Sequence, residues 1–399
     1  MNNNQSILRQ IPKGIWVLGF VSMLMDISSE IIHSLLPLFM VTSLGMSAFA
    51  VGMVEGIAEA TAMIVRVFSG ALSDYLGKRK GLILFGYVLG AFTKPVFALT
   101  SSMGLVLAAR FLDRLGKGIR STPRDALVAD MAPERLRGAS FGLRQSLDTL
   151  GAFFGPLLAS GMMLLWCDNF RMVFWVAVIP GMIAVVLVIV GVREPERKNV
   201  RPGGSPVSLH KFKQLGPAYW QVVAIGAIVM LARFSEAFLV LRAQQTGIPM
   251  TFVPLVMVAM NCIYAMTSYP FGKLADSANH ATLLTIGLCV LLVADIALAV
   301  GGHWSVILAG VAFWGIHMGM SQGLLATMVA CASPKKLRGV AFGCFNLVVG
   351  VTALFSSLAA GFIWDAYGAS STFYMGASCC VISILLLLFR SQKFRSPTL

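Results

Sequence analysis

The sequence has 399 residues, of which 57% are hydrophobic and 12% charged, and its formal net charge is +14. A water-soluble globule is excluded, because its surface would need about a quarter of charged residues. Long apolar runs such as Val173–Val192 and Tyr374–Phe389 indicate membrane-spanning helices, since the strands of a membrane barrel would alternate polar and apolar residues over about ten residues.

The apolar segments predict twelve spans, arranged as six, a break and six. The break at 193–216 contains a charged run followed by Pro-Gly-Gly-Ser-Pro, which is typical of a linker in water. We therefore predict an all-α membrane protein with an N-terminal six-helix bundle at 1–192, a cytoplasmic linker at 193–216 and a C-terminal six-helix bundle at 217–399. The predicted spans are 14–43, 48–73, 81–100, 104–131, 138–164, 171–192, 217–244, 251–270, 281–301, 304–332, 339–364 and 371–389.

Basic residues outside these spans lie almost entirely on one side of the membrane. That side carries both chain ends and the 193–216 linker, whereas the other side has Arg171 alone. Positively charged loops stay in the cytoplasm, so both termini are predicted to be cytoplasmic in a multi-pass protein of the cytoplasmic (inner) membrane. Topology thus explains the excess charge, and nucleic acid is not expected as a partner.

The cysteines lie mostly in apolar stretches without C-x-x-C spacing, so packing is favoured over metal or redox chemistry. The sequence also lacks a nucleotide-binding P-loop, a catalytic triad and metal-ligand spacing. We therefore expect no cofactor, no metal and no enzymatic activity.

The two halves of the sequence repeat each other. The segment 132–142 returns at 333–343, an offset of 201, and Gly70–Asp74 returns as Gly272–Asp276, an offset of 202. Two matches at nearly one spacing, both at a predicted cytoplasmic span end, indicate pseudo-symmetric bundles with a site near the membrane midplane.

Several motifs resemble those of the major facilitator superfamily. The segment Gly70-Ala-Leu-Ser-Asp74-Tyr-Leu-Gly77-Lys78-Arg79 resembles the GxLxDxxGRR signature between spans two and three. Arg110, followed by Gly116 and Gly118, resembles the fourth-span signature, although this chain carries more charge there. The segment Gly151-Ala-Phe-Phe-Gly155-Pro156 resembles the family's antiporter signature in part, because Ala159-Ser160 replace the expected glycine pair.

The resemblance covers essentially the whole chain and implies the twelve-helix major facilitator fold, similar to drug/proton antiporters, with the substrate branch unassigned. It gives Arg110 a role in proton coupling. It also implies that the loop between spans two and three is a gating hinge. The residues expected to form this hinge are Gly70, Asp74, Gly77, Lys78 and Arg79.

Span one places Asp26, Glu30 and His33 on one helical face, because the residues are four and three apart. Two carboxyl groups inside the membrane suit proton coupling, since desolvation and like-charge repulsion both favour a bound proton. The alternative is that either acid only neutralises an arginine of span four or seven. For His33 alone, a role as a hydrogen-bonded packing residue is favoured over proton coupling.

Span two adds Glu59, which could face the cavity or a gate. Span four is the most charged and contributes the candidates Arg110, Asp113, Arg114 and Lys117. Its glycines and Pro123 predict a local opening of the helix near the midplane. Most charges of the spans must nevertheless pair, because each unpaired one would cost about 3 kcal/mol.

In span five, Gly151, Gly155 and Pro156 would let a neighbouring helix approach closely. In span seven, the pair Ser235-Glu236 repeats Ser29-Glu30 of span one, so Arg233 and Glu236 are also candidates for the cavity.

The sequence therefore predicts a proton-coupled secondary transporter that exports a small organic molecule by alternating access. The expected partners are the substrate, protons and the lipid bilayer, with the protein acting as a monomer. Three alternatives remain open: uptake or exchange of an anionic metabolite on the basic stripe of span four, a transporter-like receptor or sensor without flux, and an intramembrane enzyme. The last would need a nucleophile and a base on facing helices, and the sequence shows no such pair.

Overall fold

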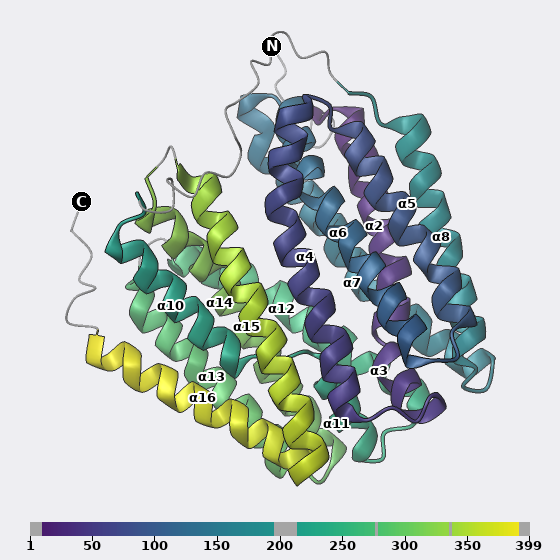
Figure 1. Ribbon diagram of the computed structural model, residues 1–399, viewed down its shortest axis with the longest axis vertical. Coiled ribbons are helices and arrows are strands. Elements are labelled where there is room, and N and C mark those ends of the chain that lie inside the picture. The colour runs from purple at the N-terminus through teal and green to yellow at the C-terminus, as the bar shows by residue number, and fades with distance from the viewer. Residues whose placement is uncertain (1–9, 195–213, 276–277, 335–336, 391–399) are drawn as a thin grey trace, which may run out of the picture. The chain divides into compact units, whose positions relative to one another are not determined.

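The computed structural model describes residues 10–194, 214–275, 278–334 and 337–390. These residues form helices joined by short connections, and none of them lies in a β-strand (Figure 1). The predicted all-α fold is confirmed. In chain order the described helices are α2 (Lys13–His33), α3 (Leu36–Leu38), η1 (Phe39–Ser43), α4 (Ala48–Leu76), α5 (Lys80–Leu99), α6 (Met103–Met131), η2 (Glu134–Leu136), α7 (Arg137–Leu165), α8 (Phe170–Gly191), α10 (Pro217–Ala232), α11 (Ala237–Gln245), η3 (Met250–Phe252), α12 (Pro254–Ala275), α13 (His280–Val300), α14 (Trp304–Ala332), α15 (Arg338–Tyr367) and α16 (Ala369–Arg390).

Eleven helical segments in the described part of the chain are long and apolar enough to cross a membrane. The helix α6 is not one of them, although its 29 residues would extend over about 44 Å at 1.5 Å per residue. The length of α6 is sufficient to cross a membrane. It differs from the other spans in composition, because its charged residues make it less apolar. The charged fourth span is therefore present as a full-length helix.

The expected opening of span four is wrong, because α6 is continuous from Met103 to Met131. Its glycines serve close helix packing instead. A Cβ on Gly116 would lie 2.7 Å from the carbonyl oxygen of Gly86 on α5, and one on Gly118 would lie 2.7 Å from the Val65 side chain on α4. Small residues at these positions let the helix backbones approach each other.

The break occurs in span seven, which the sequence predicts as one helix over 217–244. Helix α10 ends at Ala232, α11 begins at Ala237, and Arg233–Glu236 connect them without helical structure. The hydroxyl of Ser235 accepts a hydrogen bond from the backbone N–H of Ala237 at 3.2 Å. A serine that binds nearby backbone groups competes with helical hydrogen bonding, which stabilises the break.

Span one is also not a single helix over 14–43. Helix α2 ends at His33, and the chain continues through the short α3 into the π-helical turn η1 at Phe39–Ser43. Pro37 lies within α3, and proline cannot donate the backbone hydrogen bond that would continue α2. The regular α-helix therefore ends directly after Glu30 and His33, which are ionisable residues of α2.

The contacts between residues divide the chain into two compact units. Unit 1 comprises 1–35 and 61–207, and unit 2 comprises 36–60 and 208–399. The expected bundle boundary falls in the 193–216 linker, of which 195–213 lie outside the described residues. The start of α4, at 48–60, belongs to unit 2 although it precedes the predicted boundary.

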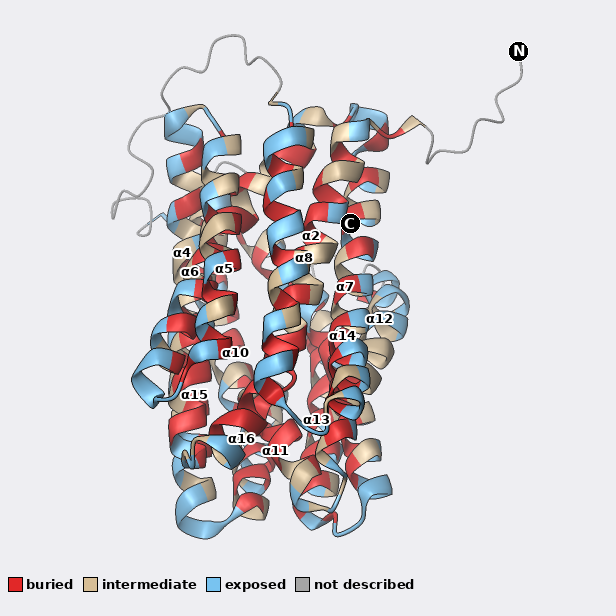
Figure 2. Cartoon of the chain, turned by 90° about the vertical axis from the view of Figure 1, so that its right-hand side faces the viewer, coloured by how far each residue is buried: buried red, intermediate tan, exposed pale blue. Residues whose placement is uncertain are grey.

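Unit 1 packs α2 against α7 and α8, and it packs α5 against α6 and α8. Its apolar core lies where these helices meet and is coloured as buried in Figure 2. The core residues include Ile15, Leu18, Met25, Tyr87 and Val188. Such side chains anchor the rotation of each helix, and that rotation decides which polar residues face one another.

Unit 2 packs α13 between α14 and α16, and it packs α10 against α15 and α16. The start of α4 lies against α15, where a Cβ on Gly52 would come within 2.3 Å of the Ser357 carbonyl oxygen. The side chain of Asp365 at the end of α15 accepts hydrogen bonds from the N–H groups of Ala48 and Phe49 at 3.0 and 2.9 Å. A carboxylate at this position satisfies the free amides that begin α4.

Candidate functional site

The charged side chains of unit 1 gather on α2, α5, α6 and α7. The cluster includes all the span-one and span-four candidates predicted from sequence. Because these helices pack against one another, the charges face protein rather than lipid, as the cost of burying ions requires. We call this set of residues the unit 1 charge cluster: Asp26, Glu30, His33, Lys94, Arg110, Asp113, Arg114, Lys117, Arg120, Arg124, Asp125, Arg144 and Asp148.

A buried ion pair joins α5 to α6. The ammonium of Lys94 donates a hydrogen bond to Asp113 Oδ1 at 2.7 Å and another to Ser29 Oγ on α2 at 3.0 Å. Arg110 NH1 lies 3.9 Å from the other oxygen of Asp113. The side chains of Lys94, Arg110 and Asp113 are each less than 5% exposed, so these two cations balance the charge of Asp113 inside the protein, together with the nearby Arg114.

Asp26 differs from Asp113, because among the described residues it makes no hydrogen bond and no ion pair. It lies on the same face of α2 as Glu30, opposite α7. The charged groups that act on it electrostatically are Asp148 on α7 and three basic residues of α6, namely Lys117, Arg120 and Arg124. A carboxyl group between another acid and several cations can gain or lose a proton without breaking a direct ion pair.

Glu30 lies one turn further along α2 and has a direct partner. Its Oε2 lies 3.4 Å from Nδ1 of His33, and the charges of Lys117 and Arg114 also act on it. The structure thus brings the three span-one candidates to one face, as the spacing predicts. The local pairing makes Glu30 less available than Asp26 for cycling a proton.

Helix α7 lies directly against these two acids. A Cβ on Gly151 would lie 2.9 Å from Asp26 Cβ, and one on Gly155 would lie 2.5 Å from Glu30 Cβ. Only a residue without a side chain fits at either position. The antiporter-like segment Gly151–Pro156, in which Pro156 is also buried, therefore forms the surface on which the acidic face of α2 rests.

A second ion network links α6 to α7. Arg144 NH1 lies 2.8 Å from Asp148 Oδ2 and 3.4 Å from Asp125 Oδ1. Arg124 Nε lies 3.1 Å from Asp125 Oδ1, and its NH2 lies 3.8 Å from Asp148 Oδ2. Arg124 also donates to Ser22 Oγ on α2 at 2.8 Å. This network fixes the position of Asp148 beside Asp26.

Arg120 is held by a different contact. Its guanidinium lies over the ring of Tyr87 at 4.8 Å, and its NH1 donates to the Gly86 carbonyl oxygen at 3.4 Å. A guanidinium over an aromatic face is attracted by the ring quadrupole. Arg120 is thus oriented by α5 without an acidic side chain and leaves its charge to act on Asp26.

The predicted gating loop forms a second site in unit 1. Gly77 ends α4 with φ +65°, a left-handed conformation that favours glycine. Arg79 is buried, with its Nε 2.8 Å from Asp130 Oδ2 on α6 and its NH2 3.4 Å from Asp74 Oδ1. Lys78 is exposed. The loop is therefore tied to the end of α6.

Two further contacts position this loop. Gly70 on α4 faces α6, where an added Cβ would lie 2.7 Å from Thr122 Cγ2. The carboxylate of Glu194 accepts hydrogen bonds from the backbone N–H groups of Arg79 and Lys80. An acidic side chain is favoured at the start of a helix such as α5, so the residue after span six holds the loop between spans two and three.

The remaining candidates belong to unit 2. Arg233 and Glu236 lie at the break between α10 and α11, with Arg233 NH2 3.4 Å from Glu236 Oε1. Glu59 is exposed on α4 in the part assigned to unit 2. These three residues are not members of the unit 1 charge cluster.

Sequence reasoning missed several residues of the site. Lys94 is a member of the charge cluster, Tyr87 and Ser22 contact it, and Asp130 and Glu194 hold the gating loop. An available signal was the lysine in the otherwise apolar span three, since a charge inside a membrane helix requires a partner. The tyrosine and serine carried no comparable signal.

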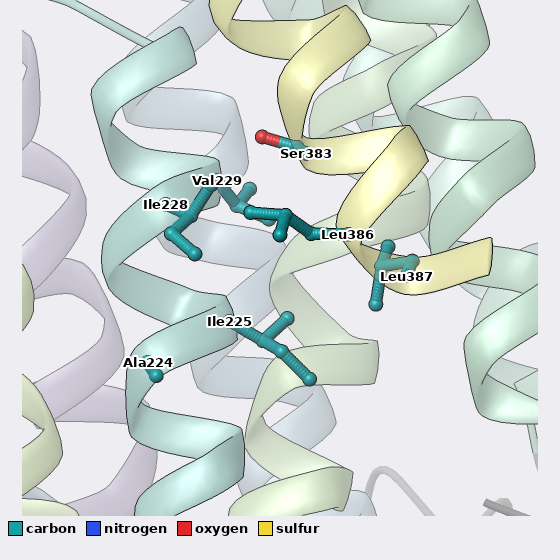
Figure 3. Close-up of a pocket in the computed structure, with 7 residues that line it drawn as sticks. All are labelled: Ala224, Ile225, Ile228, Val229, Ser383, Leu386 and Leu387. Atoms are coloured by element: carbon teal, nitrogen blue, oxygen red, sulfur yellow. The ribbon is translucent and has the colours of Figure 1, made fainter. Parts of the chain in front are cut away.

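An apolar pocket of about 160 Å³ lies elsewhere, between α10 and α16 of unit 2 (Figure 3). Its lining is aliphatic except for Ser383, whose hydroxyl donates to the Cys379 carbonyl oxygen. The pocket has no ionisable side chain and is not part of the candidate site. Among the described residues, no group of three or more His, Cys, Asp or Glu could hold a metal ion.

Comparisons with known proteins agree with this architecture. A sequence model of the Major Facilitator Superfamily matches residues 18–241 and 222–398. An uncharacterized MFS-type transporter of Methanocaldococcus jannaschii is 31% identical over 397 residues, which is 98% of each chain. The quinolone resistance protein NorA of Staphylococcus aureus is 22% identical over 394 residues, covering 95% of this chain and 97% of NorA.

A solved structure has the same fold. A bacterial homolog of the human lysosomal transporter Spinster, in an inward-facing and occupied conformation, matches with a TM-score of 0.81 at 15% identity, covering 96% of this chain and 98% of that one. These similar proteins are transporters and not enzymes, as the sequence predicts for this chain.

Proposed function

Since the chain belongs to the Major Facilitator Superfamily and is a multi-pass membrane transporter, we propose that it is a proton-coupled antiporter that exports a small organic molecule from the cytoplasm. Asp26 is the residue that takes up and releases the coupled proton. Export is supported by the similarity to NorA, named as a resistance protein, and by the antiporter-like segment of α7.

The observation that carries this proposal is the position of Asp26. Among the described residues it is the acid of the cluster's α2 face without a direct ion pair, and Asp148, Lys117 and Arg124 act on it together. Glu30 is paired with His33. A substrate or a helix movement that shifts one of the surrounding charges would change the proton affinity of Asp26, which is the requirement for coupling.

The remaining charges have separate roles in this proposal. Arg110 and Lys94 hold Asp113 ionised and keep α5, α6 and α2 together, while Arg114 and Lys117 set the potential around Glu30. Arg233 and Glu236 act in the second unit at the break of span seven. The loop residues around Arg79 control the movement of α4 and α5 during alternating access.

The test is transport by the purified protein in proteoliposomes with an imposed pH gradient. A quinolone is the first probe because of the NorA similarity, followed by a panel of cationic and anionic solutes. Wild type should move protons only when a transported solute is present. Asp26→Asn should lose pH-driven accumulation but keep exchange of labelled solute across the membrane, since exchange needs no net proton transfer.

Glu134→Gln is the matched control, because Glu134 is an exposed carboxylate in η2 outside the cluster. It should transport like wild type. If Asp26→Asn kept full pH-driven accumulation, the assignment of the coupling residue would be wrong. If wild type moved no solute of the panel, the transport proposal itself would lose its support.

A second candidate function is exchange of an anionic metabolite. It is favoured by the basic side chains that α6 adds to the buried Lys94, because the unit 1 charge cluster has more basic than acidic side chains. In the same vesicles, an exchanger would move a carboxylated or phosphorylated solute against an internal anion without a change in pH.

The orientation belongs to the same proposal: both termini and the 193–216 linker lie in the cytoplasm, and the chain resides in the inner membrane as a monomer. A reporter that is active only in the cytoplasm, fused to the C-terminus, should be active. Inactivity there would reverse the orientation.

A further inference from the structure

Asp295 on α13 is a buried acid that the proposed mechanism does not use. Its exposed fraction is 0%. Oδ2 accepts a weak hydrogen bond from the Cys380 thiol at 3.9 Å, and Oδ1 has no hydrogen-bond partner among the described residues. A carboxylate ion in such surroundings would be strongly unfavourable, because nothing compensates for the lost hydration.

The internal repeat shows how unusual this position is. Asp295 follows Lys94 by 201 residues, the offset of the repeated 132–142 segment, so the two residues occupy equivalent places in their halves. Lys94 is neutralised by Asp113. The residue 201 positions after Asp113 is Trp314, a neutral side chain whose indole N–H has no acceptor among the described residues. The position in unit 2 that corresponds to Asp113 therefore supplies no counter-charge.

The cation that contacts α13 is Arg242 on α11, and its guanidinium donates to the carbonyl oxygens of Leu298 and Ala299 at 2.8 and 3.1 Å, not to Asp295. On α14, His317 binds the Gly287 carbonyl oxygen at 2.8 Å and Ser321 at 3.4 Å. Arg233, at the break of span seven, pairs with Glu236. The remaining ionisable neighbours are thiols, namely Cys379 and Cys380 on α16 and Cys289 on α13. No basic group in the described ranges lies within ion-pair distance of Asp295.

A phenylalanine lies close to this acid. On α16, a Cβ placed on Gly376 would lie 2.7 Å from Asp295 Oδ2 and 3.0 Å from Phe234 Cε1, so both groups border the same point. Phe234 belongs to the segment between α10 and α11 and is 3% exposed. Its ring packs on those of Trp314 and Phe373 with centroids 5.5 Å apart.

The polar residues of the same break lie next to Phe234. Arg233 and Glu236 have side chains that are 16% and 23% exposed, whereas Asp295 has no exposure. Phe234 thus follows one residue of a partly exposed ion pair in the chain and borders the same point of α16 as the fully buried carboxyl group. Four residues without helical hydrogen bonding can move more easily than a helix interior.

We propose that Asp295 is a proton-binding site of unit 2, a neutral carboxylic acid whose exchange with water is controlled by Phe234 at the break of span seven. The proton is taken from water when the break opens, and it is returned to water by the same route. This inference does not rest on Asp26 as the coupling residue, because it concerns a separate group in the other unit.

The first test is infrared spectroscopy of the purified full-length protein near neutral pH. The carbonyl stretch of a protonated carboxylic acid should be present in wild type and should lose intensity in Asp295→Asn. Asp113→Asn is the matched control at the repeat-related site, and its spectrum should keep the band, because Asp113 is ionised by Lys94. An Asp295→Asn band equal to wild type would overturn the proposal.

A loss of the band through misfolding can be distinguished from loss of the acid by measuring the stability of the variants. Asp295→Asn and Asp295→Leu should both elute as folded protein with thermal midpoints equal to or above wild type, since the variants replace a neutral acid. A large fall in the midpoint for both variants would indicate an ionised Asp295 with an unseen partner and would also overturn the proposal.

The second test concerns Phe234 and uses transfer into heavy water. The Asp295 band should shift slowly in wild type and about tenfold or more faster in Phe234→Ala, because local opening limits exchange of buried groups. Phe238→Ala is the control, since that ring packs on Phe234 but approaches Gly52 on α4. Equal exchange rates in Phe234→Ala and Phe238→Ala would show that Phe234 does not control the exchange of Asp295 with water.

Discussion

Lys94 on α5 and Asp113 on α6 form an ion pair with an Nζ–Oδ1 distance of 2.7 Å, and both side chains are less than 5% exposed. Buried ion pairs add little net stability, but removal of one partner leaves an uncompensated charge. We therefore expect Lys94→Met or Asp113→Leu alone to lower the free energy of unfolding by about 3–5 kcal/mol.

The double variant Lys94→Met/Asp113→Leu should recover most of that loss, because it leaves only Arg110 without its acidic neighbour. Thermal unfolding of the detergent-purified protein measures the stability of the two single variants and of the double variant. Single variants as stable as wild type would mean that Lys94 and Asp113 do not form this ion pair in the membrane.

A side chain added at Gly155 on α7 should clash with the acidic face of α2. A Cβ there would lie 2.5 Å from Glu30 Cβ, so Gly155→Ala should push α7 away from α2 and cost about 1–3 kcal/mol, as overpacking does. Transport should fall at the same time. Gly161→Ala on the same helix is the control, since nothing lies within 4 Å of the added atom. Similar losses in both variants would point to helix flexibility and not to contact with Glu30.

Arg79 is expected to hold the gating loop on α6. Arg79→Ala removes its contacts to Asp130 and Asp74 and should destabilise unit 1 by about 2 kcal/mol, the range for hydrogen bonds to charged groups. Lys78→Ala changes the neighbouring exposed cation and should have little effect, because exposed charges contribute less than about 1 kcal/mol. The two variants are compared by limited proteolysis of the loop and by their transport rates. If both variants were cleaved equally fast, the contacts of Arg79 with Asp130 and Asp74 would not be what holds the loop.

Asp365 should secure the start of α4 against α15. Asp365→Ala leaves the N–H groups of Ala48 and Phe49 without their acceptors and should cost about 1 kcal/mol, as other helix-cap losses do. Asp365→Asn keeps one acceptor and should cost less. The readout is the alkylation rate of an Ala50→Cys probe, which is buried in the present structure. The probe should react faster in Asp365→Ala, and an unchanged rate would show that the cap does not hold the helix.

The sequence predicted the helical class and the positions of most spans, because apolar composition and length are properties of the chain alone. It also predicted the common face of Asp26 and Glu30, since a spacing of four is enough to define a helical face. The role of the glycines on α6 was predicted wrongly. Glycine both weakens a helix and permits close packing, and only the presence of Gly86 and Val65 opposite them decides between the two effects.

By itself, the sequence determined the number and order of the spans, the repeat of 201 residues and the requirement that charges inside the membrane be neutralised. The tertiary structure alone decided which charges meet. It paired Lys94 with Asp113, broke span seven at 233–236, and left Asp26 and Asp295 without an ion-pair partner among the described residues. The physical reason is that periodicity defines a face within one helix, whereas contacts between helices depend on the rotation and axial position that core packing gives each of them.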